Sequence, residues 1–447
     1  MKSKIMLTAI LLIAGLLSTG SQTEAQEIHI FTVKDAIAYG AKNSSKVKNA
    51  LLNYKIQEQT NRAITSEALP QVTGAFTFTD NMIIPTSLVP GEFAGQPAGT
   101  YIPVKFGTQY NTSAGLTLKQ VLFDGQIFVG LQARQTALNY VRKGQELTEQ
   151  DLRVNIYKVY YGLLLRRTQM DLLNANITRA KELLHNSSVM FQNGLGEKLD
   201  MDKASVQLSN LETEKVDITF NTEVDNLGLK ILLGMPIRDS LVLNDSLTFE
   251  RVRDVQLSDD QYQYADRRDF QILRLNKDLN EFDIKRYKKL YIPSVSVNAY
   301  LSQNAFRTKF DVFDNAAWYP SSYFSLNINI PIFDGLYKDA NIQKAKLSLQ
   351  QTENDMEALK IRIDGEVKQA QLRYAAAMGI LDSQKKNMDL AQSVYDQTRK
   401  KYDQGAGSNT EIITSESDLK QAQNNYLNAL YNAILAKIDY ENSIGKI

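Results

Sequence analysis

The residue types that carry most enzyme chemistry are scarce in this chain. Among its 447 residues there are two histidines, His29 and His185, and no cysteine. Thiol catalysis, disulfides and cysteine-ligated metals are therefore excluded. Neither histidine stands at a spacing typical of a metal-ligand set or a catalytic triad. The sequence thus predicts a protein that is not an enzyme, without catalytic residues, a metal or a cofactor, and it places His185 on a helix surface.

The N-terminus predicts export. Lys2 and Lys4 precede an apolar run over residues 5–17, and a small-residue cleavage site ends at Ala25. This pattern is typical of a signal peptide, here residues 1–25. A membrane anchor is the alternative, but the run is shorter than the roughly 18–20 residues that a spanning helix needs. The net charge of +1 leaves no footprint for nucleic acid, so no such partner is expected.

Each half of the chain carries the same three motifs in the same order: an aliphatic-proline pair, Phe-Asp-Gly, and Gly-x-Gly. They occupy residues 69–70, 123–125 and 194–196 in the first half and 292–293, 333–335 and 405–407 in the second. The Phe-Asp-Gly copies lie 210 residues apart and the Gly-x-Gly copies 211 apart. Such a constant offset predicts an internal duplication.

The duplication predicts two structural repeats, residues 26–236 and 258–447, joined by a linker over 237–257 with a short strand at 240–243. Each repeat should contain a helix, a β-hairpin, a long helix and a return helix. The expected helices are 33–68, 126–192 and 197–233 in the first repeat and 258–291, 336–404 and 409–443 in the second.

Proline placement and apolar spacing predict that one helix in each repeat is very long. No proline falls between Pro103 and Pro236 or after Pro331, and proline would break a helix interior. At about 1.5 Å per residue, each long helix would extend roughly 100 Å. Apolar residues recur at every seventh position, at 156, 163, 170, 177, 184 and 191 and again at 374, 381, 388, 395 and 402. This period predicts coiled-coil packing, with these side chains in the seam.

Four runs of about ten residues alternate apolar and polar side chains, as tilted membrane-spanning strands do. They lie near 72–79, 113–119, 294–301 and 323–332. A soluble sandwich would show the same alternation, but export and the long loops at 80–112 and 302–322 favour an outer-membrane barrel. Four strands cannot close a barrel. Two copies would give eight strands and a filled interior, and three copies would give twelve and a lumen, so a conduit favours a trimer.

Together these features resemble the TolC family of outer-membrane efflux channels over nearly all of the mature sequence. The order of several short motifs carries the resemblance: Thr-Val-Lys-Asp-Ala-Ile at 32–37 with Asn43-Ser44, both aliphatic-proline pairs, both Phe-Asp-Gly motifs, Tyr-Tyr-Gly-Leu-Leu at 160–164, Leu-Gly-Met-Pro at 233–236 and both glycine turns.

The resemblance implies a mainly helical fold with a transmembrane β-barrel, in which a homotrimer shares twelve strands within outer-membrane lipid. Long coiled-coil-like helices would continue as an α-helical barrel through the periplasm and dock onto a periplasmic adaptor bound to an inner-membrane transporter. The implied function is a passive exit duct for efflux or secretion, with drugs, metal ions and polypeptides all open as cargo. A trimeric coiled-coil adhesin is the alternative, although it would not need a helical hairpin in each half.

The resemblance also implies that the turns between long and return helices form the periplasmic tip and receive the adaptor. These turns are Gly194-Leu195-Gly196 and Gly405-Ala406-Gly407, with Gly407 where the family has an arginine. Glycine permits the left-handed backbone that ends a helix, so a simple helix cap with a tight turn is the other explanation.

An acidic ring constricts the pore in this family, and the matching position is Glu411, with Asp200 as its counterpart in the first repeat. Tyr402 matches a tyrosine beside the constriction, and Phe191 is its counterpart. Six carboxylates at the mouth of a trimer would attract cations. Either acid could instead be a first-turn residue favoured by the helix dipole. Thr414 replaces a second acid of the family.

Overall fold

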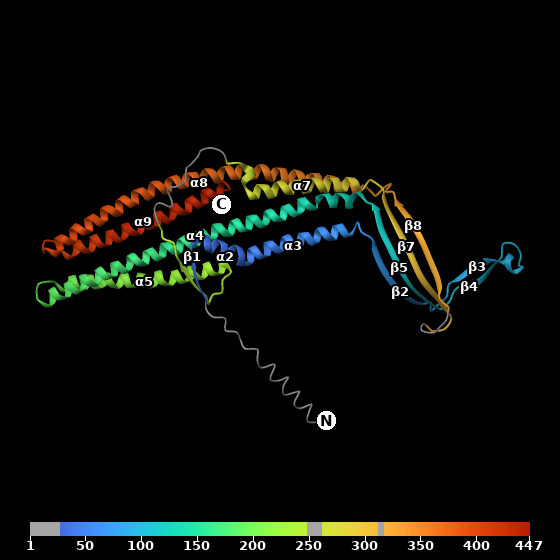
Figure 1. The fold of residues 1–447 in the computed structure, drawn as a ribbon, viewed down its shortest axis with the longest axis horizontal. Helices are drawn as coiled ribbons and strands as arrows, with labels where there is room; N and C mark the ends of the chain where they lie inside the picture. The colour runs from blue at the N-terminus through green and yellow to red at the C-terminus, as the bar shows by residue number, and fades with distance from the viewer. Residues whose placement is uncertain (1–26, 248–261, 312–316) are drawn as a thin grey trace, which may run out of the picture. The chain divides into compact units, whose positions relative to one another are not determined.

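A computed structural model describes residues 27–247, 262–311 and 317–447 (Figure 1). The predicted signal peptide and part of the predicted linker lie outside the described residues. Along the chain, the elements are β1 (Ile28–Phe31), α2 (Val33–Asn43), α3 (Ser45–Ser66), β2 (Gln71–Asp80), β3 (Thr86–Pro90), η1 (Gly91–Ala94), β4 (Tyr101–Lys105), β5 (Tyr110–Phe123), α4 (Gly125–Gln192), α5 (Lys198–Leu233), β6 (Ser240–Leu243), η2 (Tyr264–Asp266), α7 (Arg268–Lys289), β7 (Ser294–Arg307), β8 (Tyr319–Asn329), α8 (Tyr337–Asp403) and α9 (Asn409–Ser443).

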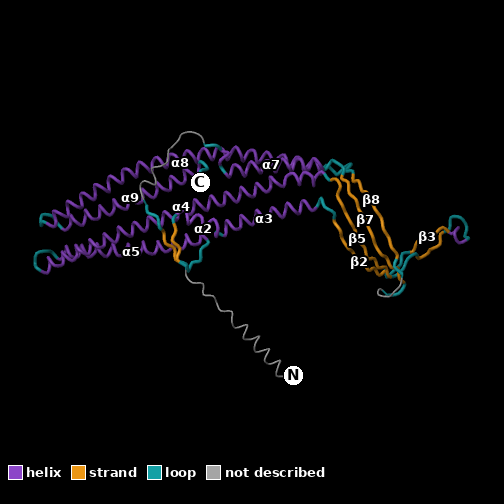
Figure 2. Tube along the Cα trace, viewed as in Figure 1, coloured by secondary structure: helices purple, strands orange, loops and turns teal. Residues whose placement is uncertain are grey.

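The chain forms two compact units that interleave along the sequence. Unit 1 draws on Met1–Lys48, Thr148–Tyr262 and Gly365–Ile447, and unit 2 on Asn49–Leu147 and Gln263–Asp364. The longest strands, β2, β5, β7 and β8, fall in unit 2 (Figure 2). Because both units take segments from each half of the sequence, the predicted repeat boundaries remain a prediction.

The two long helices are confirmed: α4 has 68 residues and α8 has 67. The return helices α5 and α9 also begin and end within one residue of their predicted bounds. None of the helices in the described ranges has both the length and the apolar character that crossing a membrane demands.

The prediction of one helix over 33–68 was wrong, because the chain breaks at Ser44 into α2 and α3. Ser44 has an extended backbone, with φ −56° and ψ 129°. The break lets the end of α5 approach closely: a Cβ added to Gly234 would lie 2.5 Å from the carbonyl oxygen of Asn43. The helix expected over 258–291 begins only at Arg268, after a short turn of η2, and residues 258–261 lie outside the described part.

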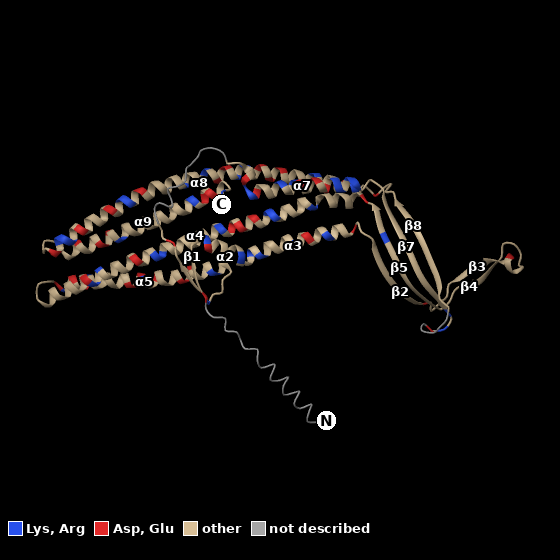
Figure 3. Ribbon diagram, in the orientation of Figure 1, with Lys and Arg blue, Asp and Glu red and all other residues tan. Residues whose placement is uncertain are grey.

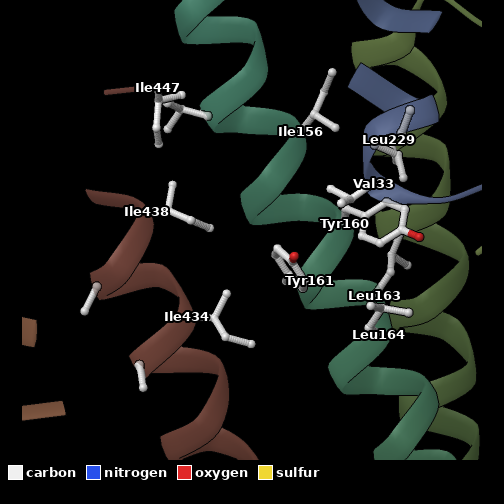
Figure 4. Packing of buried hydrophobic residues seen from close by; sticks show 14 of the residues in the cluster. Val33, Ile156, Tyr160, Tyr161, Leu163, Leu164, Leu229, Ile434, Ile438 and Ile447 are labelled. Atoms are coloured by element: carbon white, nitrogen blue, oxygen red, sulfur yellow. The ribbon is translucent and has the colours of Figure 1, made fainter. Parts of the chain in front are cut away.

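The core of unit 1 includes the seam that the seven-residue spacing predicts, together with other apolar residues of the packed helices. Figure 4 shows Ile156 and Tyr160 of α4 near Leu229 of α5, with Ile434 of α9 on the other side. Predicted seam positions that are buried in the structure are Ile156, Leu163 and Ile177 in α4 and Tyr374, Leu381 and Tyr395 in α8. In α9, the buried residues Ile412, Leu419, Ala433 and Tyr440 follow the same seven-residue spacing. The pattern fades at the turn, where Phe191 is 40% exposed.

Unit 2 contains one antiparallel four-stranded sheet in the order β2-β5-β7-β8, so the two predicted hairpins join through β5 and β7. Register places apolar residues on a common face, with Val72 opposite Leu118, Leu116 opposite Leu301 and Val297 opposite Leu326. Charged residues gather on the helices and are sparse on these strands (Figure 3). The sheet therefore has one apolar face and one face of small polar residues and tyrosines.

The structure also contains two small two-stranded sheets, β1-β6 and β3-β4. The short strand expected at 240–243 is confirmed as β6, and it pairs in parallel with β1, which the sequence did not reveal. The long loop predicted over 80–112 connects β2 to β5 and contains a hairpin of its own, formed by β3 and β4. Pro90 and Pro103 lie in these strands because both strands of an isolated hairpin are edge strands, which tolerate proline.

Tyr160 fastens the small parallel sheet to α4. Its hydroxyl lies 2.9 Å from the carbonyl oxygen of Phe31 and 2.9 Å from Oδ2 of Asp245. The same carboxylate oxygen accepts the backbone N–H of Val33 at 2.8 Å. Burial raises the pKa of Tyr160 above its usual range, so the hydroxyl stays protonated and available as a donor.

Replacing Tyr160 by phenylalanine should weaken this attachment. The change leaves a half-buried carboxylate and a half-buried carbonyl without this donor, which should lower stability by about 1–3 kcal/mol. Thermal unfolding of the detergent-solubilised protein would measure the loss. Tyr157→Phe is the matched control, because its hydroxyl has no hydrogen-bond partner among the described residues. An equal loss in both variants would contradict the role of the Tyr160 hydroxyl.

Candidate functional site at the two glycine turns

The two predicted glycine turns have the same backbone. Gly194 and Gly405 both adopt left-handed conformations, with φ of 71° and 73°. The N–H of Leu195 donates to the Met190 carbonyl at 2.8 Å, and the N–H of Ala406 donates to the Lys401 carbonyl at 3.0 Å. These bonds close the last turns of α4 and α8 in the manner of a Schellman cap. The duplication therefore extends to individual hydrogen bonds.

The second glycine of each turn is required for a different reason. A Cβ added to Gly196 would lie 3.1 Å from Cβ of Met190, and one added to Gly407 would lie 3.0 Å from the backbone nitrogen of Tyr402. Both positions face the end of the preceding helix too closely for a larger residue without movement. By contrast, a Cβ on Gly194 or Gly405 would meet nothing within 4 Å.

Contacts between α5 and α9 bring the two turns together within unit 1. The side-chain amide of Asn409 donates to the carbonyl oxygen of Asp200 at 3.0 Å. Lys203 Nζ lies 3.1 Å from the hydroxyl oxygen of Thr410. Below these polar contacts, Ala204 and Ile412 are buried in one apolar cluster. Asp200 and Glu411 consequently occupy the first turns of two neighbouring helices, and their place at a pore constriction stays a prediction.

The four residues predicted to lie at the pore constriction differ in their surroundings. Glu411 forms an ion pair with Lys401, with 3.0 Å between Oε2 and Nζ, and its backbone N–H donates to the hydroxyl of Ser408 at 3.2 Å. Lys401 holds the pKa of Glu411 below its usual range. Asp200 is half-buried in the first turn of α5.

The two aromatic candidates also diverge. Phe191 is 40% exposed, whereas Tyr402 is half-buried and packs against the apolar cluster that includes Tyr395 and Ile412. The turns thus repeat one backbone and carry different side chains.

Lys401 was not among the predicted site residues. A lysine in the last turn of one helix and an acid in the first turn of the next nevertheless indicate such an ion pair in the sequence.

A buried polar cluster above the turns was also missed. Glu416 of α9 is only 3% exposed, and its Oε1 lies 3.4 Å from Nε of Arg179 of α4. The Arg179 guanidinium stands over the ring of Tyr395 of α8, 5.3 Å from its centroid. Arg399 of α8 reaches Glu182 of α4 at 2.7 Å and the Tyr395 hydroxyl at 3.2 Å. These contacts join three helices through charged side chains.

The histidines lie away from this site. His29 of β1 packs against the rings of Phe31 and Tyr39, and its Nε2 lies 3.5 Å from Asp239. His185 is exposed on α4, as predicted. At the turns, the arrangement offers fixed charges, helix ends and projecting side chains, which suit ion attraction and protein contact.

Comparisons with known proteins find relatives of this chain in sequence and in fold. A model of the family described as outer membrane efflux protein matches residues 263–446. Outer membrane protein TolC of Vibrio cholerae is 20% identical over 339 residues, covering 75% of this chain and 77% of the relative. Outer membrane efflux protein BepC of Brucella suis is 20% identical over 455 residues, covering 99% and 91%. The crystal structure of CusC shares the fold, with a TM-score of 0.75 at 18% identity and 95% coverage of both chains.

The matching family model and the curated relatives are those of outer-membrane efflux proteins, and the solved structure shares the fold of this chain. The resemblance predicted from the sequence is confirmed, because the chain is similar to TolC-like outer membrane factors. The outer membrane is likewise confirmed as its location.

The buried cluster predicts a pH dependence of stability. Burial raises the pKa of Glu416 above 4.5, with Arg179 opposing the shift. The folded chain therefore keeps this proton to higher pH than the unfolded chain, and the associated stability is complete below pH 4.5 and is lost as pH rises through the folded-state pKa. Glu416→Gln should remove this contribution, so its melting temperature should fall less than that of the wild type between about pH 4.5 and about pH 7.

Melting curves across this pH range would test the prediction. Glu182→Gln is the control, since it removes a more exposed carboxylate from the same cluster. Parallel pH profiles for the wild type and Glu416→Gln would contradict the assignment.

Proposed function

We propose that this chain forms the passive outer-membrane exit duct of a tripartite export system, as a homotrimer with a shared twelve-stranded barrel. The observation that carries the proposal is an open four-stranded sheet with one apolar face. The names of the relatives, outer-membrane efflux proteins, support the same role without catalysis.

The edges of the sheet support assembly. Strands β2 and β8 each have one side without a partner strand in the described part of the chain. Unpaired backbone groups are not tolerated in lipid, so these edges must meet other strands. In the antiparallel order β2-β5-β7-β8, the first and last strands run in opposite directions, so β8 of one copy can continue the antiparallel pattern with β2 of the next. Three copies would give twelve strands, enough for a lumen.

The faces of the sheet support membrane insertion. The four strands contain three charged residues: Asp80 and Arg307 at strand ends, and Lys119 on the polar face. Phe78, Tyr110 and Phe310 cluster at one end of the sheet, with ring centroids 5.6–6.0 Å apart. An apolar band edged by aromatic residues is typical of outer-membrane barrels.

Two helices of unit 1 carry exposed apolar stripes that support the same assembly. The stripe on α5 comprises Leu199, Val206, Val216, Phe220, Val224, Leu227 and Ile231. The stripe on the unit 1 part of α8 comprises Leu372, Ile380, Leu390 and Val394. Exposed apolar surface of this extent marks an interaction site. We infer that the α5 stripe of one copy packs on the α8 stripe of the next, a head-to-tail contact that closes a ring.

A charge in the α5 stripe should block assembly. Phe220 is 65% exposed in the single chain, and burying a phenylalanine contributes about 1.5–3 kcal/mol. Phe220→Glu should therefore lower the trimer fraction about tenfold or more, measured by light scattering in detergent, and should abolish pores in planar bilayers. Thr219→Glu adds the same charge one position away from the stripe and should assemble normally. Full trimerisation of Phe220→Glu would contradict the contact.

The turns are proposed as the adaptor-contact surface. Leu195 is 76% exposed between the two glycines of the first turn, and it can be replaced without backbone strain because it lacks a positive φ. Leu195→Glu should reduce export about tenfold or more if this side chain is buried against the adaptor. An export assay in cells, with trimer content measured alongside, would test it. Leu195→Met should export normally, and normal export by Leu195→Glu would argue against docking here.

A further inference from the structure

The Lys401–Glu411 ion pair is the clearest difference between the two turns. It links the last turn of α8 to the first turn of α9, with 3.0 Å between Nζ and Oε2. The residue at the matching position of the first turn is Met190, since the carbonyls of Met190 and Lys401 accept the equivalent backbone N–H in each cap. The duplicated backbone therefore provides an internal comparison, with a cation in one copy and a thioether in the other.

The charges of the two acids differ as a result. Glu411 has Lys401 beside it, whereas Asp200 has an uncharged side chain at the corresponding position. Met190 is 43% exposed, so a longer charged residue could be accommodated there. Asp403, the nearby acid of α8, lies 3.8 Å from Arg399, and Lys203 contacts the hydroxyl of Thr410 instead of a carboxylate.

We propose that Lys401 sets the ion selectivity of the duct by neutralising Glu411, which leaves Asp200 as the net negative charge of the two acidic positions. This inference rests on the proposed function. A homotrimer would then present three uncompensated carboxylates at its mouth instead of six, in threefold rather than sixfold order. Cations would still be favoured, but less strongly than the acidic residues alone suggest.

Because the Lys401–Glu411 ion pair is exposed, we expect it to affect permeating ions more than the stability of the fold. Side chains of Lys401 and Glu411 are 52% and 49% exposed, and exposed ion pairs stabilise a fold little. A permeating ion, however, responds to the net charge within a Debye length of about 8–10 Å. In a constriction of that scale, adding or removing one charge per chain changes the local concentration of counter-ions.

The test exchanges the residues of the two turns. Full-length protein, purified as the assembled oligomer, is placed in planar bilayers under a potassium chloride gradient, and the reversal potential gives the ratio of cation to anion permeability. Lys401→Met, which copies the first turn, should raise this ratio about twofold or more, and Met190→Lys, which copies the second, should lower it comparably. Lys401→Gln repeats the first change with a polar side chain, in case the methionine disturbs folding.

A double variant separates net charge from an indirect effect. Lys401→Met with Glu411→Gln removes both charges, so its ratio should return to the wild-type value. The inference is overturned if the wild type conducts while Lys401→Met and Lys401→Gln keep the wild-type ratio, or if the double variant stays as shifted as Lys401→Met. Those results would not contradict the proposed function as an exit duct. An assembled wild-type protein that forms no pore would instead overturn the proposed function.

Discussion

Backbone hydrogen bonding is the constraint on which the rest of this molecule depends. A four-stranded sheet with an apolar face can enter lipid only if the outer sides of β2 and β8 find partners. The described sheet of a single chain has no further strand that could pair with these edges, so the pairing strands must come from other copies. If copies pair their strands in this way, the exposed stripes on α5 and α8 are the surfaces through which we propose that their helices meet.

The long helices are under a second constraint, because nearly 70 residues must stay ordered in each helix without a conventional globular core. Seven-residue spacing supplies a continuous seam, and buried residues such as Ile156 and Leu381 follow it. Close to the turns the seam changes character. Charged side chains from α4, α8 and α9 meet around Glu416 and Arg179, so packing there relies on ion pairs whose partners must stay aligned. Buried polar groups of this kind can specify helix register at a cost in stability.

Features set by local chemistry were predictable from the sequence, and features set by tertiary contact were not. Proline-free spans and seven-residue spacing predicted α4 and α8, and paired glycines predicted both turns, because each depends on its own residues. The break at Ser44 lies where Gly234 packs against Asn43, a contact between residues far apart in the sequence. Strand β1 exists only because β6 pairs with it. Similarly, Asp200 and Glu411 could be selected as candidates, but the buried position of Glu416 required the packed helices.

The two halves of the chain therefore agree in the backbone of their turns and differ in the side chains. The backbone of the two turns has stayed the same because left-handed glycines and helix-end hydrogen bonds leave few alternatives. Side chains at the same positions, such as Met190 and Lys401, meet no such restriction and have diverged. If the strands and helices must close a ring, the repeated backbone supplies the approximate sixfold geometry, and the side chains reduce it to threefold. Selectivity in such a duct would then arise where the two halves differ, not where they agree.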